Sequence, residues 1–187
     1  MPTPARTSID EIVDAGRAIL EAEGLEGLTM QAVASVVGVR APSLYKRIRG
    51  RDQLIHLIAN DVARELANTL DRAATTGDPR ADLRGLAMVF RAFAVSHPEA
   101  HRLLFDRLPE AARVDPELNA RAAATLLRTA GALAGPEHAL EAARTVVAWA
   151  NGFVSMELGG SFRLGGDVDA AFTYGIDRLI QSISSGD

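Results

Sequence analysis

The fold is decided by residues 29–54, which read TMQAVASVVGVRAPSLYKRIRGRDQL. This stretch predicts a helix, a tight turn, a second helix of about five to seven residues and a basic link into a third helix. Thr29 supplies an N-cap oxygen for the first helix. Gly38 stands where a helix ends in a left-handed residue, a conformation that glycine adopts at least cost. Because Pro42 is tolerated only in the first turn of a helix, it marks the start of the second helix.

The apolar residues of this stretch are spaced so that both helices have an inward side. Four of them recur with helical spacing along the first helix: Met30, Val33, Ala34 and Val37. Leu44 and Ile48 face the core from the second helix, four residues apart. The exposed side of the second helix is left with Ser43, Tyr45, Lys46 and Arg47.

Positive charge is concentrated around this pair of helices. Between Thr29 and Arg51 there is no Asp or Glu, and the cations are Arg40, Lys46, Arg47, Arg49 and Arg51. In a chain of net charge −4, this local surplus indicates a polyanionic partner. The alternative is a solvated basic face beside an ordinary helical hairpin. The turn chemistry and the short second helix favour an element that enters the major groove of DNA.

The composition indicates a helical protein. The chain has 187 residues, 48% of them hydrophobic and only 5% aromatic, and no stretch alternates at period two. It has no cysteine, which excludes disulfides, a thiol nucleophile and Cys-based metal sites. Neither a signal peptide nor an apolar membrane-spanning run is evident, so we expect a cytoplasmic protein with no membrane partner.

Turn and cap signals divide the chain into domains. Ser8 and Glu11 form a capping box at the start of the first helix. A fourth helix begins near Asp52, and the polar run 75–79 is the clearest boundary. We therefore expect a three-helix DNA-binding domain over residues 1–52, a connecting helix over 52–71 and a larger helical domain over 78–187. Proline and capping residues mark the starts and ends of further helices in the larger domain. We therefore expect an all-α fold with about nine helices in total.

Two later helices have unusually broad apolar arcs. The helix over 136–158 has an arc of about 200°, far wider than the stripe that faces a single core. This breadth predicts a homodimer with a four-helix interface. The expected interface residues are Leu140, Val147, Val154, Phe172, Ile176 and Leu179. The alternative is a central helix that its own domain covers on both sides.

Residues 8–70 resemble the DNA-binding domain of the tetracycline-repressor (TetR) family of bacterial regulators. The resemblance rests on the run 24–29, the Val33-Ala34 and Gly38-Val39 pairs, Leu44-Tyr45, and the cation and leucine at Arg51 and Leu54. Ile48 departs from the pattern, because an aromatic residue is usual there. The runs 97–105 and 149–158 look like the ligand-binding domain of one TetR subgroup, in which a histidine often replaces Asn151.

The resemblance implies a role for several residues of the helix pair. Thr29, Tyr45 and Arg51 would contact phosphates, and Lys46 would reach a phosphate or a base edge. The groove end of the recognition helix would comprise Arg40, Ala41, Pro42 and Ser43. The side-chain chemistry agrees independently of the family, because Arg and Ser can bond base edges, whereas Tyr, Lys and Thr fix the register without reading the sequence. Arg40 is the candidate base contact, with a phosphate clamp at the helix start as its competing role.

Other side chains offer weaker chemistry. His97, His101 and Asp106 are close in sequence, but Pro98 breaks the shared helical face that a metal pair would need, so we expect a helix-end and a surface histidine and no metal or cofactor. Glu157 falls inside the broad arc, where it would need an arginine, amides or a ligand cation, unless it sits in water at the frayed helix end. Five aromatic residues could line an apolar effector pocket between helices or could belong to the core: Phe90, Phe93, Phe105, Trp149 and Phe153.

These observations predict a dimeric regulator, most simply a repressor released from a palindromic double-stranded DNA operator by a small apolar effector. One rival is an enzyme that binds an anionic substrate with the basic hairpin, although no nucleophile, base or metal set is assembled in the sequence. The other is a helical protein-binding module without DNA activity.

Overall fold

The computed structural model describes residues 8–105 and 108–184, which are helical and contain no strand. The all-α prediction is therefore confirmed for this part of the chain. The chain divides into two compact units. The N-terminal unit comprises residues up to 63 together with 97–115, and the C-terminal unit comprises 64–96 together with the residues from 116 onward.

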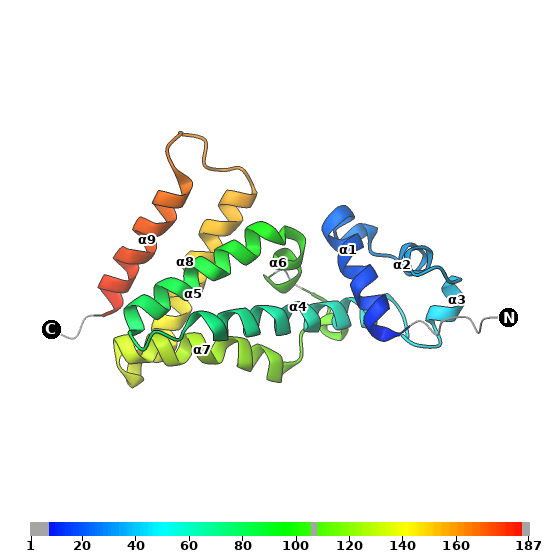
Figure 1. Ribbon diagram of the computed structural model, residues 1–187, viewed down its shortest axis with the longest axis horizontal. Coiled ribbons are helices and arrows are strands. Elements are labelled where there is room, and N and C mark those ends of the chain that lie inside the picture. Colours follow the sequence, from blue (N-terminus) through cyan, green and yellow to red (C-terminus); the bar gives the residue numbers. More distant parts are fainter. Residues whose placement is uncertain (1–7, 106–107, 185–187) are drawn as a thin grey trace. The chain divides into compact units, whose positions relative to one another are not determined.

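The N-terminal unit holds the first three helices, part of the fourth and a later one. Its elements are α1 (Ile9–Gly27), α2 (Met30–Val36), α3 (Ala41–Leu44), the first part of α4 (Arg51–Ala73), α6 (Pro98–Phe105) and the short 3-10 turn η1 (Glu110–Ala112) (Figure 1). The predicted capping box opens α1, with the Glu11 amide donating to Ser8 Oγ at 3.0 Å. Gly16 lets α1 approach α4 closely, because a Cβ there would lie 2.5 Å from Cδ1 of Ile58.

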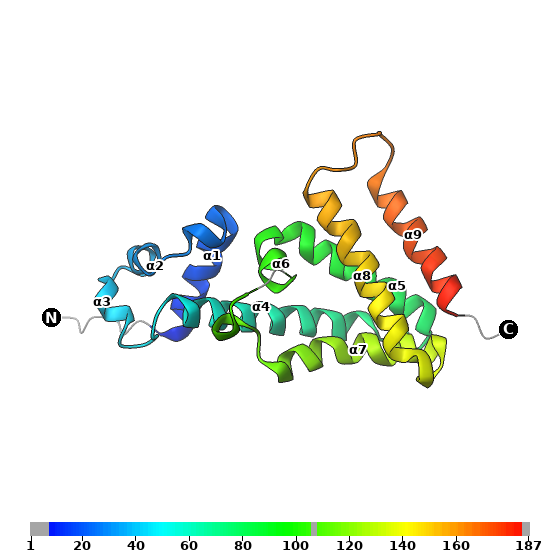
Figure 2. The same ribbon diagram turned by 180° about the vertical axis from the view of Figure 1, so that it is seen from behind.

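The C-terminal unit is a bundle arranged around α8. Its elements are the rest of α4, α5 (Pro79–Ser96), α7 (Pro116–Ala134), η2 (Pro136–His138), α8 (Ala139–Leu158) and α9 (Val168–Ile183). Helix α8 packs against α7, α5 and α9, and the pair α8–α9 is joined by residues 159–167 (Figure 2). Asp167 caps α9, accepting from the amides of Asp169 and Ala170.

The division into units differs from the predicted domain boundaries. Residues 97–115 lie inside the predicted C-terminal domain by sequence order, yet they belong to the N-terminal unit. Ala100, Leu103 and Ala112 are buried, and α6 packs on α1. Burial of apolar side chains between segments far apart in sequence is what attaches this piece to the N-terminal unit.

Three of the predicted interface residues are core residues of the single chain. Val154, Phe172 and Ile176 are each 0% exposed, so no partner surface can cover them. The broad arc of α8 has three neighbouring helices to cover it within its own unit, which was the alternative interpretation. Leu179 is partly buried, whereas Leu140 and Val147 remain 45% and 38% exposed.

In the part of the chain that the structure describes, no helix combines the length and apolar character that crossing a bilayer requires.

Candidate nucleic-acid interface

The α2–α3 turn has the local chemistry that the sequence predicted. Thr29 caps α2, its Oγ1 accepting from the amide of Ala32 at 3.1 Å. Gly38 has φ 72°, in the left-handed region that a glycine adopts without strain. The amide of Val39 donates to the carbonyl of Ala34 at 2.9 Å, which completes the reverse turn that ends α2.

Helix α3 is shorter than predicted, at four residues. The amide of Lys46 points to the carbonyl of Ser43, three residues back, so the chain tightens into a turn after Leu44. The amide of Ile48 still bonds to the carbonyl of Leu44 at 2.9 Å. Both Leu44 and Ile48 are buried, as predicted, and they anchor the short helix to the core.

The exposed side of this pair carries the residues predicted to contact DNA. Thr29, Arg40, Pro42, Ser43, Tyr45 and Lys46 are all exposed, and Ala41 is partly buried. Arg40 is the N-cap residue of α3, and its side chain makes no capping bond. The aromatic side chain of Tyr45 projects outward, since the residue is 55% exposed.

The cations around α3 are not neutralised by nearby acids. Among the described residues, no carboxylate lies within 4.0 Å of the charged groups of Arg40, Lys46, Arg47 or Arg49. The backbone between α3 and α4 is held in place, because the amide of Arg49 donates to Oε1 of Gln53 at 2.6 Å. A positive surface without nearby acidic partners is therefore available to an anionic partner.

Arg51 has a structural role that the sequence analysis missed. Its Nε donates to the carbonyl of Leu28 at 2.8 Å, and one of its terminal nitrogens donates to the carbonyl of Leu25. These bonds tie the start of α4 to the turn between α1 and α2. No local signal could have revealed them, because the partners are 23 and 26 residues away.

The five predicted pocket residues are divided between the two units. Phe90 and Phe93 are buried, whereas Trp149 and Phe153 are partly buried. The rings of Trp149 and Phe153 both contact Phe172, with centroids 5.0 and 5.1 Å from its own. Phe105 belongs to the N-terminal unit.

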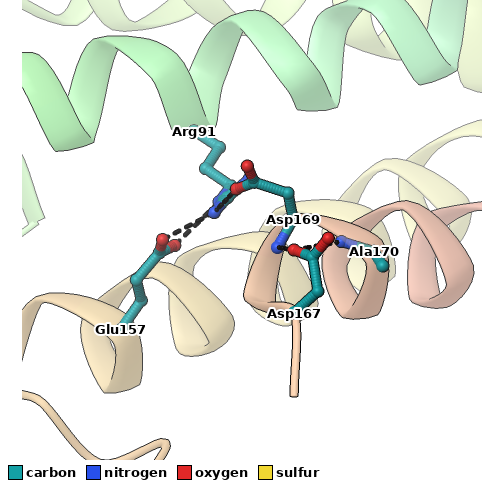
Figure 3. Close-up of polar contacts among 5 residues, drawn as sticks. All are labelled: Arg91, Glu157, Asp167, Asp169 and Ala170. Carbon is teal, nitrogen blue, oxygen red and sulfur yellow. Dashed lines mark hydrogen bonds and ion pairs between the residues drawn. The ribbon is translucent and has the colours of Figure 1, made fainter. Parts of the chain in front are cut away.

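Glu157 is paired with an arginine rather than solvated alone at the helix end. Arg91 of α5 donates through Nε and Nη2 to its two carboxylate oxygens at 2.7 and 2.6 Å (Figure 3). The same Nη2 donates to Asp169 of α9 at 2.6 Å. These bonds raise the pKa of Arg91 well above its ordinary value, chiefly through Glu157. One guanidinium thus joins α5, α8 and α9.

One of the two histidines is placed differently from the expectation. His97 lies at a helix end, between α5 and α6, as expected, but His101 is buried rather than at the surface. Among the described residues no three side chains of metal-binding type gather at one place. Asp106 lies outside the described residues.

Helix α2, the turn at Gly38 and the short exposed helix α3 form a helix-turn-helix. A helical bundle accompanies it in the same chain, as in helical transcriptional regulators. Residues 12–58 match the family model described as bacterial regulatory proteins, tetR family. Residues 83–179 match the model described as tetracyclin repressor-like, C-terminal domain. The chain belongs to the tetR family.

Several relatives share this family. The uncharacterized HTH-type transcriptional regulator Rv0681 of Mycobacterium tuberculosis is 30% identical, over 94% of this chain and 81% of its own length. The HTH-type transcriptional repressor DrrR1 of Streptomyces coeruleorubidus is 37% identical over 52% of this chain and 35% of its own length. These proteins are named as transcriptional regulators, not enzymes.

A solved structure shows the same fold over nearly the whole chain. The crystal structure of a TetR variant from Acinetobacter baumannii AYE, in complex with minocycline, has a TM-score of 0.70 and 24% identity, and the match covers 94% of this chain and 96% of that one. Other curated relatives, 34% identical, are matched over 45% of their own length, so this chain spans about half of them.

Proposed function

We propose that this protein is a homodimeric repressor that binds a palindromic operator and is released by a small apolar effector. The observation that carries the proposal is the group of exposed cations beside α3 that no described carboxylate neutralises. The names of the family and of the repressor DrrR1 support the same function.

The exposed residues are suited to two kinds of DNA contact. The hydroxyls of Thr29 and Tyr45 and the ammonium of Lys46 would donate to phosphate oxygens and fix the register on the duplex. Arg40 and Ser43 would meet base edges, and a bidentate arginine–guanine contact discriminates by about 1–3 kcal/mol. Arg51, which already supports the α1–α2 turn, would offer one of its remaining donors to a phosphate.

The proposed effector would bind in the C-terminal unit, which contains Phe172. The aromatic group around Phe172 would supply apolar contacts, and a neighbour of the same fold is described in complex with minocycline. An effector needs only to bind better to a conformation that fits the operator poorly. A coupling of about 1–3 kcal/mol would lower operator affinity roughly 5- to 150-fold.

The dimer would place two α3 helices in successive major grooves about 34 Å apart. The proposed interface has fewer residues than the interface predicted from the sequence, because several of the predicted residues are buried in the single chain. It would use exposed apolar residues of α8 and α9, which are Leu140, Val147 and Tyr174.

The test is the selection of bound fragments from the source genome, followed by titrations of one selected duplex at several salt concentrations. Log affinity should fall against log salt with a slope near −0.9 for each phosphate neutralised. Lys46→Ala should weaken binding to all duplexes alike, whereas Arg40→Ala should relax the preference at one base pair. Arg80→Ala, which removes an exposed cation of α5, is the matched control. Failure to retain any duplex, even in dilute buffer, would overturn the proposal.

A further inference from the structure

The ion cluster of the C-terminal unit leaves part of its guanidinium unused. A guanidinium has five N–H donors. In Arg91, Nε and Nη2 donate to Glu157, and Nη2 also donates to Asp169 (Figure 3). Nη1 has no acceptor among the described residues. Because Arg91 is only 9% exposed, the two donors on Nη1 need a partner more than those of a surface arginine do.

Aromatic rings pack beside this guanidinium. We name the rings of Trp149, Phe153, Phe162 and Phe172 the aromatic cluster. The centroid of Phe153 lies 4.7 Å from that of Phe162 and 5.1 Å from that of Phe172. The guanidinium of Arg91 lies over the ring of Phe172, 5.1 Å from its centroid. The aromatic cluster extends from Phe172, which is fully buried, to Phe162, which is 40% exposed, so it reaches the surface of the unit.

The charges around Arg91 decide which polar group can bind Nη1. Two carboxylates already surround the single guanidinium, so the ion cluster has an excess of negative charge. A ligand carboxylate or phosphate would be repelled by both of them. A ligand ammonium has no acceptor for the Nη1 donors. A carbonyl oxygen accepts hydrogen bonds and brings no charge, so the ion cluster favours an uncharged acceptor.

We propose that Arg91 and the aromatic cluster bind an uncharged aromatic ketone or a related carbonyl compound. The ring of the ligand would contact Trp149 and Phe153, which are only partly buried, and its carbonyl oxygen would accept from Nη1 of Arg91. This inference deepens the function proposed above, and it rests on that function for the role of the ligand as the effector. Arg91 is then the residue that selects ligands by charge.

The chain carries its own reporter of this site, because Trp149 is its only tryptophan. Its indole N–H therefore gives a single signal in nitrogen-edited NMR spectra. The probes are three benzene derivatives of similar shape, which are acetophenone, an uncharged ketone, cumene, which has no acceptor, and benzoate, which carries a carboxylate. Each probe is titrated into the full chain. The ratio of the acetophenone and cumene affinities isolates the hydrogen bond, because both probes bury the same ring.

Two substitutions separate the spare donors from the charge. Arg91→Lys keeps the positive charge, but an ammonium has only three donors, and the oxygens of Glu157 and Asp169 that are now bonded would use all of them. Asp169→Asn removes a negative charge from a side chain that is 80% exposed and leaves Nη1 in place. The matched controls are Arg84→Lys and Asp177→Asn, which alter the exposed ion pair between the same two helices.

We expect the wild type to bind acetophenone best and benzoate least. Arg91→Lys should lower the ratio of acetophenone to cumene affinity at least about fivefold. Asp169→Asn should raise the benzoate affinity at least about threefold and change the acetophenone affinity less than about twofold. Both control variants should bind all three probes as the wild type does.

Three results would overturn the inference: an unchanged affinity ratio in Arg91→Lys, benzoate binding as tight as acetophenone binding in the wild type, or a Trp149 signal that acetophenone does not shift. The titrations contain no DNA, so they are independent of operator binding. A protein that binds acetophenone but no duplex would overturn the proposed function and the effector role. A protein that binds its duplex but not acetophenone would overturn this inference alone.

Discussion

Arg91 shows how a single side chain can hold a charge inside the C-terminal unit. It is almost fully buried, and its guanidinium also lies over the ring of Phe172, 5.1 Å from the centroid. The cost of removing this charge from water is offset only because two carboxylates and an aromatic face surround it. Losing Arg91 would leave the Glu157 carboxylate, whose side chain is 20% exposed, without its cation.

We expect Arg91→Met to lower the free energy of unfolding by about 3 kcal/mol, because Glu157 would remain largely buried without a partner. The matched control is Arg84→Met, which removes the exposed pair with Asp177 and should cost less than about 1 kcal/mol. Urea denaturation of the two variants checks this. Equal midpoints would show that the Arg91 cluster does not stabilise the bundle.

Titration of Asp82 makes the free energy of unfolding depend on pH. Its Oδ1 accepts from the backbone amide of Thr76 at 2.9 Å and from the hydroxyl of the same residue at 2.7 Å. The amide bond is the main cause that lowers the pKa of Asp82 below its ordinary value of 3.8. The carboxylate is therefore stabilised in the folded state.

Since the folded pKa is lowered, the contribution of Asp82 to stability is complete above pH 3.8 and is lost as pH falls through the folded pKa. Asp82→Asn should therefore show a smaller loss of unfolding free energy than the wild type in this acidic range. Urea midpoints measured from about pH 6 down to about pH 2.5 test this. Parallel curves for both proteins would rule out the contribution of Asp82.

At the scale of helices, the sequence predicted those features that depend on neighbouring residues. The caps at Ser8 and Thr29 and the turn at Gly38 are all present, because each is made by bonds within a few residues. The length of α3 was overestimated, because apolar spacing does not reveal where a helix tightens into a turn.

The features that were not predicted depend on long-range contacts. Arg51 bonds carbonyls in the α1–α2 turn, and Glu157 finds Arg91 66 residues away. Phe172 was assigned to an interface because helical angles show that a face is apolar but not which helix covers it. Exposure of the predicted DNA residues could be anticipated, but the actual DNA contacts stay predictions.

The turn before α3 should tolerate only residues that adopt a left-handed conformation. At Gly38 a Cβ would meet nothing within 4 Å, so the cost of Gly38→Val is backbone strain, at least about 1–2 kcal/mol. Gly38→Asn should cost less, because asparagine adopts this conformation more readily. Thermal unfolding measures both costs, and duplex affinity should fall in the same order.

Gly77 is the control for position. It has φ 80° and equally open surroundings, but it lies in the C-terminal unit. Gly77→Val should lose similar stability and keep its duplex affinity. If Gly77→Val weakened DNA binding as much as Gly38→Val, the effect would come from stability and not from the orientation of α3.

For the whole molecule, burial decides which substitutions can test the proposed dimer. Phe172→Glu would place a charge in the core and unfold the chain, so it reports nothing about assembly. Val147→Glu changes a residue that is already exposed. A second copy packed there would have to desolvate the new carboxylate, which disfavours association.

We expect Val147→Glu to shift the protein from dimer to monomer without a change in helical content. Val95→Glu makes the same change at a 48% exposed position on α5 and should leave the dimer intact. Light scattering after size-exclusion chromatography, with circular dichroism in parallel, compares the two. A dimeric Val147→Glu protein would contradict the proposed interface.

The discontinuous N-terminal unit has a consequence for anyone who builds chimeras of this protein. A cut after α4 would remove residues 97–115, uncover the apolar contacts of Ala100 and Leu103, and leave the Glu21 carboxylate without the amides it caps. A transplantable DNA-binding module must therefore carry this insertion with it. Exchanging the C-terminal residues between relatives at a cut after α4 would divide the N-terminal unit in two.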